Sequence, residues 1–232
     1  MLAQRLGLSI NSTRPLGAWS PDNESTLEGW YQNKVGITLN GTDVSEWADS
    51  SSNGYDMVQA TATEQPAYNA STGALTFVPA DTNNLQTTGQ ISLSGDFTIG
   101  IKLDVNAVGG VIVADNTTAG EFMGRFTSTT QLRIRIDNTS AINIAKDSGS
   151  FVEDAYMVIT RVSGLISLWW KGTEQASTAT LTGTADIDAI GVRSNDVNPF
   201  DGTISEIQIY SSSSATLTAN VNDRLSSLKN KL

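Results

Sequence analysis

The chain has 232 residues, of which 14 are basic and 24 acidic, for a net charge of −10, and it contains no cysteine and no histidine. The missing cysteines exclude disulfides and thiolate metal sites, and the missing histidines exclude Ser-His-Asp and Cys-His catalysis and His-ligated zinc. The acidic balance leaves no basic footprint for a nucleic acid, and no run of about 18 apolar residues is present for insertion into a membrane.

The first segment, residues 1–25, is irregular and is predicted to form an arm in front of one large domain, residues 26–232. Its apolar residues precede a series of turn residues and are predicted to contact a neighbouring molecule; they are Leu2, Leu6, Leu8 and Ile10. The alternative is that the arm covers one face of its own domain. Arg5 interrupts the apolar stretch and no small-residue cleavage site follows, so no secretory signal peptide is expected.

From residue 27 onward, short apolar segments alternate with turns, and no helical period separates them. The clearest strand is Phe97–Val105, in which apolar residues alternate with Thr98, Gly100, Lys102 and Asp104. This period of two directs the apolar set into a core, and it predicts that the polar set faces water or a ligand.

The remaining predicted strands are short and follow one another at a spacing of roughly 8–12 residues. They are Leu27–Gln32, Val44–Ala48, Tyr55–Ala60, Ala74–Val78, Gln90–Leu93, Val111–Ala114, Glu121–Thr127, Gln131–Asp137, Ala141–Ala145, Tyr156–Val162, Leu165–Lys171, Asp186–Val192 and Thr203–Tyr210. Such a succession predicts an all-β, antiparallel sandwich rather than a βαβ fold. The predicted core contains Trp30, Trp47, Phe77, Phe97, Ile99, Ile101, Ile134, Ile136, Leu168, Ile207 and Ile209.

Two adjacent tryptophans lie in the predicted strand Leu165–Lys171, so their rings must point to opposite faces of the sheet. Ile166 and Leu168 place Trp170 in the core, and Trp169 is then predicted to face outward. There it could stack on a sugar or fill a subunit interface. The alternative is that the arm or a second layer covers it.

One α-helix is predicted at the C-terminus, over about residues 216–231, from apolar residues at helical spacing. These residues are Leu217, Val221, Leu225, Leu228 and Leu232. Thr216 or Thr218 is the predicted N-cap, and Lys229 and Lys231 occupy the last turn, where the helix dipole favours positive charge.

Three stretches resemble the concanavalin A-like lectin/glucanase superfamily, in its laminin-G-like branch. The first joins Trp30-Tyr31 to Trp47-Ala-Asp49-Ser-Ser-Ser-Asn53-Gly54, which is similar to a W-x-D-x-S-G-N-G opening with Ser52 in place of glycine. The others are Gln65–Tyr68 with Leu75–Phe77 and Phe97–Ile99, and Phe200–Tyr210 followed by the helix. The resemblance implies a jelly roll of two stacked antiparallel sheets, and it does not fix the function.

Glucanases of this superfamily use a strand with an E-x-D-x-(x)-E pattern, and no such spacing occurs in this chain. Glu153 and Asp154 are adjacent and would point to opposite faces, and Glu46 and Asp49 flank a turn. No catalytic residue, metal ligand or cofactor is therefore assigned, and no enzyme is expected. Ca²⁺ is the one cofactor considered, at Asp49/Asn53, Asp115/Asn116, Asp186/Asp188 and Ser194-Asn195-Asp196. The favoured alternative is that these residues cap turns.

The superfamily includes lectins, glycan hydrolases, adhesion modules and structural proteins of tailed phages. The Ser/Thr/Asn-rich composition without cysteine or histidine resembles the phage group in style. The first hypothesis is therefore a non-enzymatic structural protein of a virus particle. It would be a capsid-decoration or tail-fibre component that assembles in the host cytoplasm. It would form a homo-oligomer and also contact other virion proteins. The alternative is a carbohydrate-binding, lectin-like adhesion module that recognises host-surface glycans.

Overall fold

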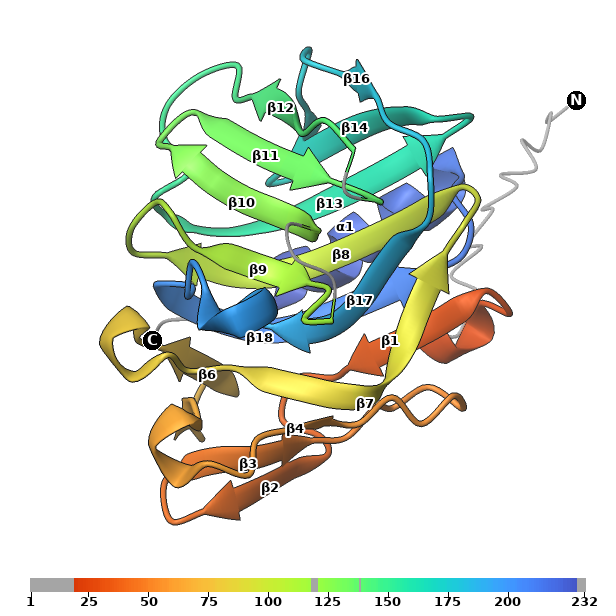
Figure 1. The fold of residues 1–232 in the computed structure, drawn as a ribbon. Coiled ribbons are helices and arrows are strands. Elements are labelled where there is room, and N and C mark those ends of the chain that lie inside the picture. The colour runs from red at the N-terminus through yellow and green to blue at the C-terminus, as the bar shows by residue number, and fades with distance from the viewer. Residues whose placement is uncertain (1–18, 118–120, 138, 229–232) are drawn as a thin grey trace, which may run out of the picture.

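The structure is a computed structural model, and it describes residues 19–117, 121–137 and 139–228. Antiparallel strands and one C-terminal helix make up these residues, which confirms the predicted fold class (Figure 1). No helix within the described ranges is long and apolar enough to cross a membrane. The predicted contact residues of the arm, Leu2, Leu6, Leu8 and Ile10, lie outside the described residues.

Short strands follow one another along the chain, and a single α-helix comes after the last of them. The strands and the helix are β1 (Leu27–Tyr31), β2 (Ile37–Asn40), β3 (Asp43–Trp47), β4 (Met57–Val58), β5 (Ala67–Asn69), β6 (Ala74–Phe77), β7 (Leu85–Leu93), β8 (Phe97–Val105), β9 (Val111–Ala114), β10 (Phe122–Ser128), β11 (Gln131–Arg135), β12 (Ile142–Ala145), β13 (Asp154–Val162), β14 (Leu165–Trp170), β15 (Thr173–Glu174), β16 (Ala179–Thr180), β17 (Ala185–Ile190), β18 (Gly202–Tyr210) and α1 (Ala215–Ser227). Short 3-10 turns lie at Pro21–Asn23, Ala62–Glu64, Pro79–Asp81 and Ser194–Asp196.

Strand pairing falls into two runs. In one run, β18 lies between β1 and β8, and β8 continues to β13 and β14. In the other, β4, β7, β17, β9, β10, β11 and β12 pair in that order. β5 pairs with both β3 and β6, so hydrogen bonding joins the two runs into one continuous sheet. The pairings alone therefore do not divide the fold into the two separate sheets that the resemblance implies.

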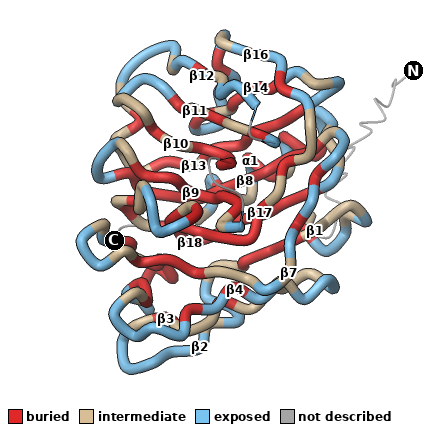
Figure 2. The backbone as a smooth tube through the Cα atoms, in the orientation of Figure 1, coloured by how far each residue is buried: buried red, intermediate tan, exposed pale blue. Residues whose placement is uncertain are grey.

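Side chains from both runs share one core. Ile101 of β8 and Ile187 of β17 belong to the same buried cluster. The rings of Phe126, Phe151 and Trp170 meet there, and Phe151 lies 4.7 Å from Trp170 between centroids. Figure 2 shows that burial is concentrated in the central strands, whereas β2 and most loops are exposed. All predicted core residues are buried, which confirms that set: Trp30, Trp47, Phe77, Phe97, Ile99, Ile101, Ile134, Ile136, Leu168, Ile207 and Ile209.

The prediction that the polar face of β8 meets water or a ligand is wrong, because every residue of this strand is buried. Helix α1 lies against the outer face of β8 and β13 and covers this side of the sheet (Figure 1). Gly100 permits the close approach, since a Cβ at this position would overlap the side chain of Val221. Lys102 is buried as well, and its Nζ forms an ion pair with Asp154 at 2.8 Å.

Helix α1 begins one residue before the predicted start. Its N-cap is Ser214, whose side chain accepts a hydrogen bond from the Leu217 backbone at 3.0 Å, and not Thr216 or Thr218. A run of four serines precedes the helix, and any of them can cap, so the sequence pattern left the register open. The apolar stripe does face the sheet, with Leu217, Val221 and Leu225 buried. Lys229 and Lys231 lie outside the described residues.

Glu206 of β18 fastens α1 to the sheet. Its side chain is fully buried, and Arg224 of the helix donates to it through Nε and through Nη2, the latter at 3.0 Å. Trp30, Gln208 and the Asn33 backbone donate to the same carboxylate at 3.2, 2.7 and 3.2 Å. The Arg224 guanidinium also lies over the Trp30 ring, 4.9 Å from its centroid. One buried charge thus connects the helix, β18 and β1.

Of the hairpins β13–β14 and β2–β3, only the first was predicted from its turn residues. The predicted hairpin of β13 and β14 is confirmed, and Ser163 and Gly164 form its turn with positive φ angles of 50° and 84°. Strand β2 was not predicted, although Asn40-Gly41 is a hairpin signal. Gly41 takes a φ of 70° in the turn between β2 and β3.

Candidate functional site

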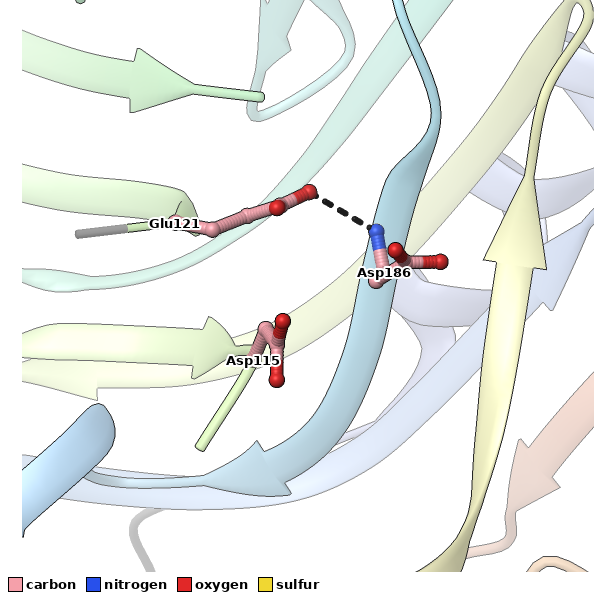
Figure 3. A group of neighbouring side chains, drawn as sticks. All are labelled: Asp115, Glu121 and Asp186. Atoms are coloured by element: carbon pink, nitrogen blue, oxygen red, sulfur yellow. Dashed lines mark hydrogen bonds between the residues drawn. The ribbon is translucent and has the colours of Figure 1, made fainter. Parts of the chain in front are cut away.

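An acidic cluster lies where three strands of the second run end or begin. It consists of Asp115, after β9, Glu121, before β10, and Asp186 on β17, and one oxygen atom from each lies within 4.8 Å of the others. Figure 3 shows Glu121 reaching toward the backbone N–H of Asp186, which donates to it at 2.9 Å, with Asp115 beside them. The Asp186 side chain also accepts a 2.6 Å hydrogen bond from Ser92 of β7. Strand pairing therefore sets the geometry of the cluster.

Burial changes the acidity of this cluster. Burial, opposed by the backbone donors of Asp186 and Asp137 and reinforced by the charges of Asp186 and Asp115, raises the pKa of Glu121 to about 7. Burial likewise raises the pKa of Asp188, which lies two residues after Asp186 on β17, to about 6. The backbone N–H of Asn116 donates to Asp188. Ionising all of these neighbouring carboxyl groups at once is therefore unfavourable in the folded chain.

The donor set suits a divalent cation. Ca²⁺ binds carboxylate oxygens at about 2.3–2.6 Å, so ligand oxygens around one ion lie up to roughly 5 Å apart, as in this cluster. A bound cation would reverse the unfavourable charge balance and favour ionised carboxylates. Asp115, Glu121 and Asp186 are thus the residues that could hold such an ion. Glu121 was not a predicted candidate, whereas the structure unites the predicted pairs Asp115/Asn116 and Asp186/Asp188 through the pairing of β9 with β17.

An open cleft with a volume of about 510 Å³ begins at Asn116, the residue that follows Asp115 of the acidic cluster. We call it the amide cleft, because Gln59, Gln86, Asn116 and Asn195 line it together with Glu64 and Asp196. Asn116 Nδ2 donates to Gln86 Oε1 at 2.8 Å, and Gln86 Nε2 donates to Asn84 at 3.0 Å. Asn116 Oδ1 has no hydrogen-bond partner among the described residues. The cleft is therefore lined by a chain of amides, beside one buried acceptor without a partner in the described part of the chain.

The loop over residues 194–198 forms part of this cleft and is strained. Asn195, Asp196 and Asn198 have positive φ angles of 60°, 55° and 59°. Three such residues in one short loop are unusual, and Asn and Asp are the side chains that tolerate this conformation best. The predicted group Ser194-Asn195-Asp196 thus lies at the amide cleft, where Asn195 and Asp196 line the wall.

The remaining predicted pair, Asp49 and Asn53, organises a loop. Asp49 accepts from the backbones of Trp30, Ser51 and Tyr55 at 2.8, 2.8 and 3.1 Å and from the Ser51 hydroxyl at 2.6 Å. Asn53 donates to the backbone oxygens of residues 27 and 28. These contacts hold the opening motif of the resemblance against β1, and neither residue belongs to the acidic cluster.

Trp169 belongs to a different part of the surface from the amide cleft. Trp170 is buried and Trp169 is half-buried beside α1, in the apolar cluster between the helix and the sheet. Its outward orientation follows the alternation of β14, and the helix forms the partial cover. The structure therefore does not bring Trp169 together with the acidic residues.

A family model described as the concanavalin A-like lectin/glucanases superfamily matches residues 79–219. No protein with a curated description matches the sequence. Among solved structures, the binding domain of Paraclostridial Mosquitocidal Protein 1 is similar with a TM-score of 0.57 and 12% identity, over 90% of this chain and 53% of that one. Trypanosoma rangeli sialidase is similar with a TM-score of 0.54 and 12% identity, over 88% of this chain and 33% of that one.

Domain 4 of AbnA, a GH43 extracellular arabinanase from Geobacillus stearothermophilus solved in complex with arabinotriose, has a TM-score of 0.56 and 14% identity. This match covers 87% of this chain and 98% of that domain. The chain thus spans about half of the toxin domain and a third of the sialidase. Identities this low show a shared fold alone, but the family model covers more than half of the sequence. The chain belongs to the concanavalin A-like lectin/glucanases superfamily.

Proposed function

We propose that this chain is a non-enzymatic carbohydrate-binding module and that its glycan lies in the amide cleft. The observation that carries the proposal is the chain of amides that lines that cleft, in which Asn116 Nδ2 donates to Gln86 Oε1. Side-chain amides both donate and accept, which matches the paired donor and acceptor character of sugar hydroxyls. The arabinanase domain in complex with arabinotriose supports the ligand class by likeness of fold.

The acidic cluster could be mistaken for the carboxylate pair of a glycosidase, because Glu121 has a raised pKa and Asp115 lies close to it. However, Glu121 is 2% exposed and Asp115 is 0% exposed, and this burial argues against a reaction of the two carboxyl groups with a glycosidic bond. The adjacent pair Glu153 and Asp154 is engaged separately, with Lys146 at 2.7 Å and Lys102 at 2.8 Å. We therefore expect no reducing sugar to be released from laminarin, agarose, carrageenan or alginate, and turnover of any of them would contradict this part of the proposal.

A glycan array followed by isothermal titration calorimetry tests the binding. For the best glycan on the array, Gln86→Ala and Asn116→Ala should each weaken the affinity about tenfold, the effect of removing one or two hydrogen bonds to a ligand. Gln90→Ala is the matched control, since Gln90 is exposed on the same strand as Gln86 and does not line the cleft. Equal affinities for all three variants would show that the glycan does not lie in the amide cleft.

A place in a virus particle stays a prediction. The names of the similar structures describe a toxin domain, a sialidase and an arabinanase domain, and none of these three describes a virion protein. The homo-oligomer that this role implies can be measured by light scattering of the purified chain. A monomer at all concentrations would count against a capsid-decoration or tail-fibre role, whereas it would leave carbohydrate binding unaffected.

A further inference from the structure

We infer that the outer face carries a second ligand site, for a neutral sugar ring, between the β13–β14 hairpin and helix α1. A hollow of about 340 Å³ lies there, and we call it the aromatic cleft. Tyr156 and Trp169 line it on the sheet side, and Thr218, Ala219, Asn222 and Asp223 line it on the helix side. Its residues are distinct from those of the amide cleft, so the inference goes beyond the proposed function.

The two rings are held in place from below. Trp169 pairs in the ladder with Val158, which is buried in the apolar cluster under α1, and both Trp169 and Tyr156 pack against that cluster. Each ring is half-buried, packs against this cluster and also borders the cleft. Gly172, with a φ of 78°, follows β14 beside Tyr156, and a Cβ there would lie 3.2 Å from the Tyr156 hydroxyl oxygen. The aromatic wall is thus preformed.

The helix supplies room and a polar partner. Leu217, Val221 and Leu225 point into the sheet, and the small residues on the flank of the same helix leave space beside the rings. Asn222 lines the cleft and is only 9% exposed, and its Nδ2 donates to the backbone oxygen of Thr218 at 2.9 Å. The Oδ1 atom of Asn222 has no hydrogen-bond partner among the described residues. A buried acceptor in this state is unfavourable, and a donor from a ligand would satisfy it.

The lining chemistry selects the ligand class. An aromatic face binds the apolar face of a sugar ring, and hydroxyl groups at the ring edge can donate to Asn222 Oδ1 and to the Asp223 carboxylate. No lysine or arginine is among the described residues that line the cleft, and Asp223 would repel an acidic group. The cleft therefore favours neutral sugars over sialic or uronic acids.

Calorimetric titration of the full chain with neutral trisaccharides tests the site, using cello-, xylo-, malto- and arabinotriose. Trp169→Ala should weaken the tightest of these at least tenfold, or about 1.4 kcal/mol. Trp19→Ala is the matched control, because Trp19 is also half-buried against the apolar cluster under α1 but lines a different hollow. Ala219→Phe should block binding without touching the rings, since Ala219 is exposed in the free chain and lines the cleft.

Asn222→Ala separates a ligand contact from a structural role. If Asn222 Oδ1 contacts the sugar, the variant should lose about tenfold in affinity while its melting temperature stays within about 2 °C, since the loss of the Asn222–Thr218 hydrogen bond is offset by the removal of an unsatisfied buried acceptor. A melting temperature that falls with unchanged affinity would overturn the inference. Trisaccharide binding that survives Trp169→Ala but is lost in Gln86→Ala would also overturn it and would leave the proposed function standing. If none of the four trisaccharides binds, the inference of a neutral-sugar site in the aromatic cleft is refuted. Charged glycans on the array would still test binding in the amide cleft.

Discussion

Replacing Arg224 by methionine should loosen helix α1 from the sheet while keeping a side chain of similar length over Trp30. The substitution leaves the Glu206 carboxylate buried, with 0% exposure, and without the guanidinium. Removing one partner of a buried ion pair costs about 3–5 kcal/mol. We expect about 3 kcal/mol, the lower end of that range, because Trp30, Gln208 and Asn33 still donate to Glu206 and the Arg224 side chain is 22% exposed.

Urea unfolding followed by tryptophan fluorescence measures this loss, and calorimetry should show a fall in melting temperature of about 6–12 °C for a domain of this size. Arg133→Met is the control, since Arg133 bonds Asn143 in an exposed contact and should lose less than about 0.5 kcal/mol. The double variant Arg224→Met with Glu206→Gln should lose less than the sum of the two single variants, because the buried charge is gone. A loss below about 1 kcal/mol for Arg224→Met, or strict additivity in the double variant, would refute the idea that this ion pair fastens the helix.

Three further predictions concern the core and the acidic cluster. Because the pKa values of Glu121 and Asp188 are raised in the folded chain, the folded state binds protons more tightly than the unfolded state. In EDTA, the free energy of unfolding should therefore fall by on the order of 2 kcal/mol as pH rises from about 4.5 to 7. In urea titrations, Glu121→Gln should make this dependence on pH weaker. A slope unchanged by Glu121→Gln would assign the pH dependence to other groups. Ile101→Ala should cost about 2–5 kcal/mol by leaving a cavity, and a loss within the error of urea unfolding would mean that the site collapses fully. Gly100→Val should displace α1 at a cost of about 1–3 kcal/mol, seen as faster hydrogen exchange in residues 215–227, and unchanged exchange would show that the helix adapts.

Local alternation predicted the inner face of β8 correctly, because Ile99 and Ile101 need only a period of two to reach the core. The outer face was mispredicted, since its cover is a helix more than a hundred residues later in the chain, and no local period reports on docking. Gly100 in the middle of an apolar strand was the available signal, because a glycine there marks a close backbone approach.

The candidate sites depend still more on distant pairing. The acidic residues at 115 and 186 were visible as turn-like pairs, but only the ladder between β9 and β17 brings them together. Glu121 carried no signal of its own, since it joins the cluster through a hydrogen bond to Asp186, 65 positions away. The orientation of Trp169 was predictable from its neighbour Trp170, whereas the position of Asn222 in the same cleft depended on where α1 packs.

The position of β18 has a consequence for how this chain can acquire its structure. This strand pairs with β1, β6 and β8, so residues 27–31 find their partner only at residues 207–210. A nascent chain that has not yet exposed residue 210 therefore leaves the hydrogen-bonding edge of β8 that faces β18 unpaired. Folding must wait for the last strand, and such long-range pairing slows it and lengthens the time during which that edge can associate with other chains. The emergence of β18, rather than the addition of successive hairpins, is then the step that commits this domain to its fold.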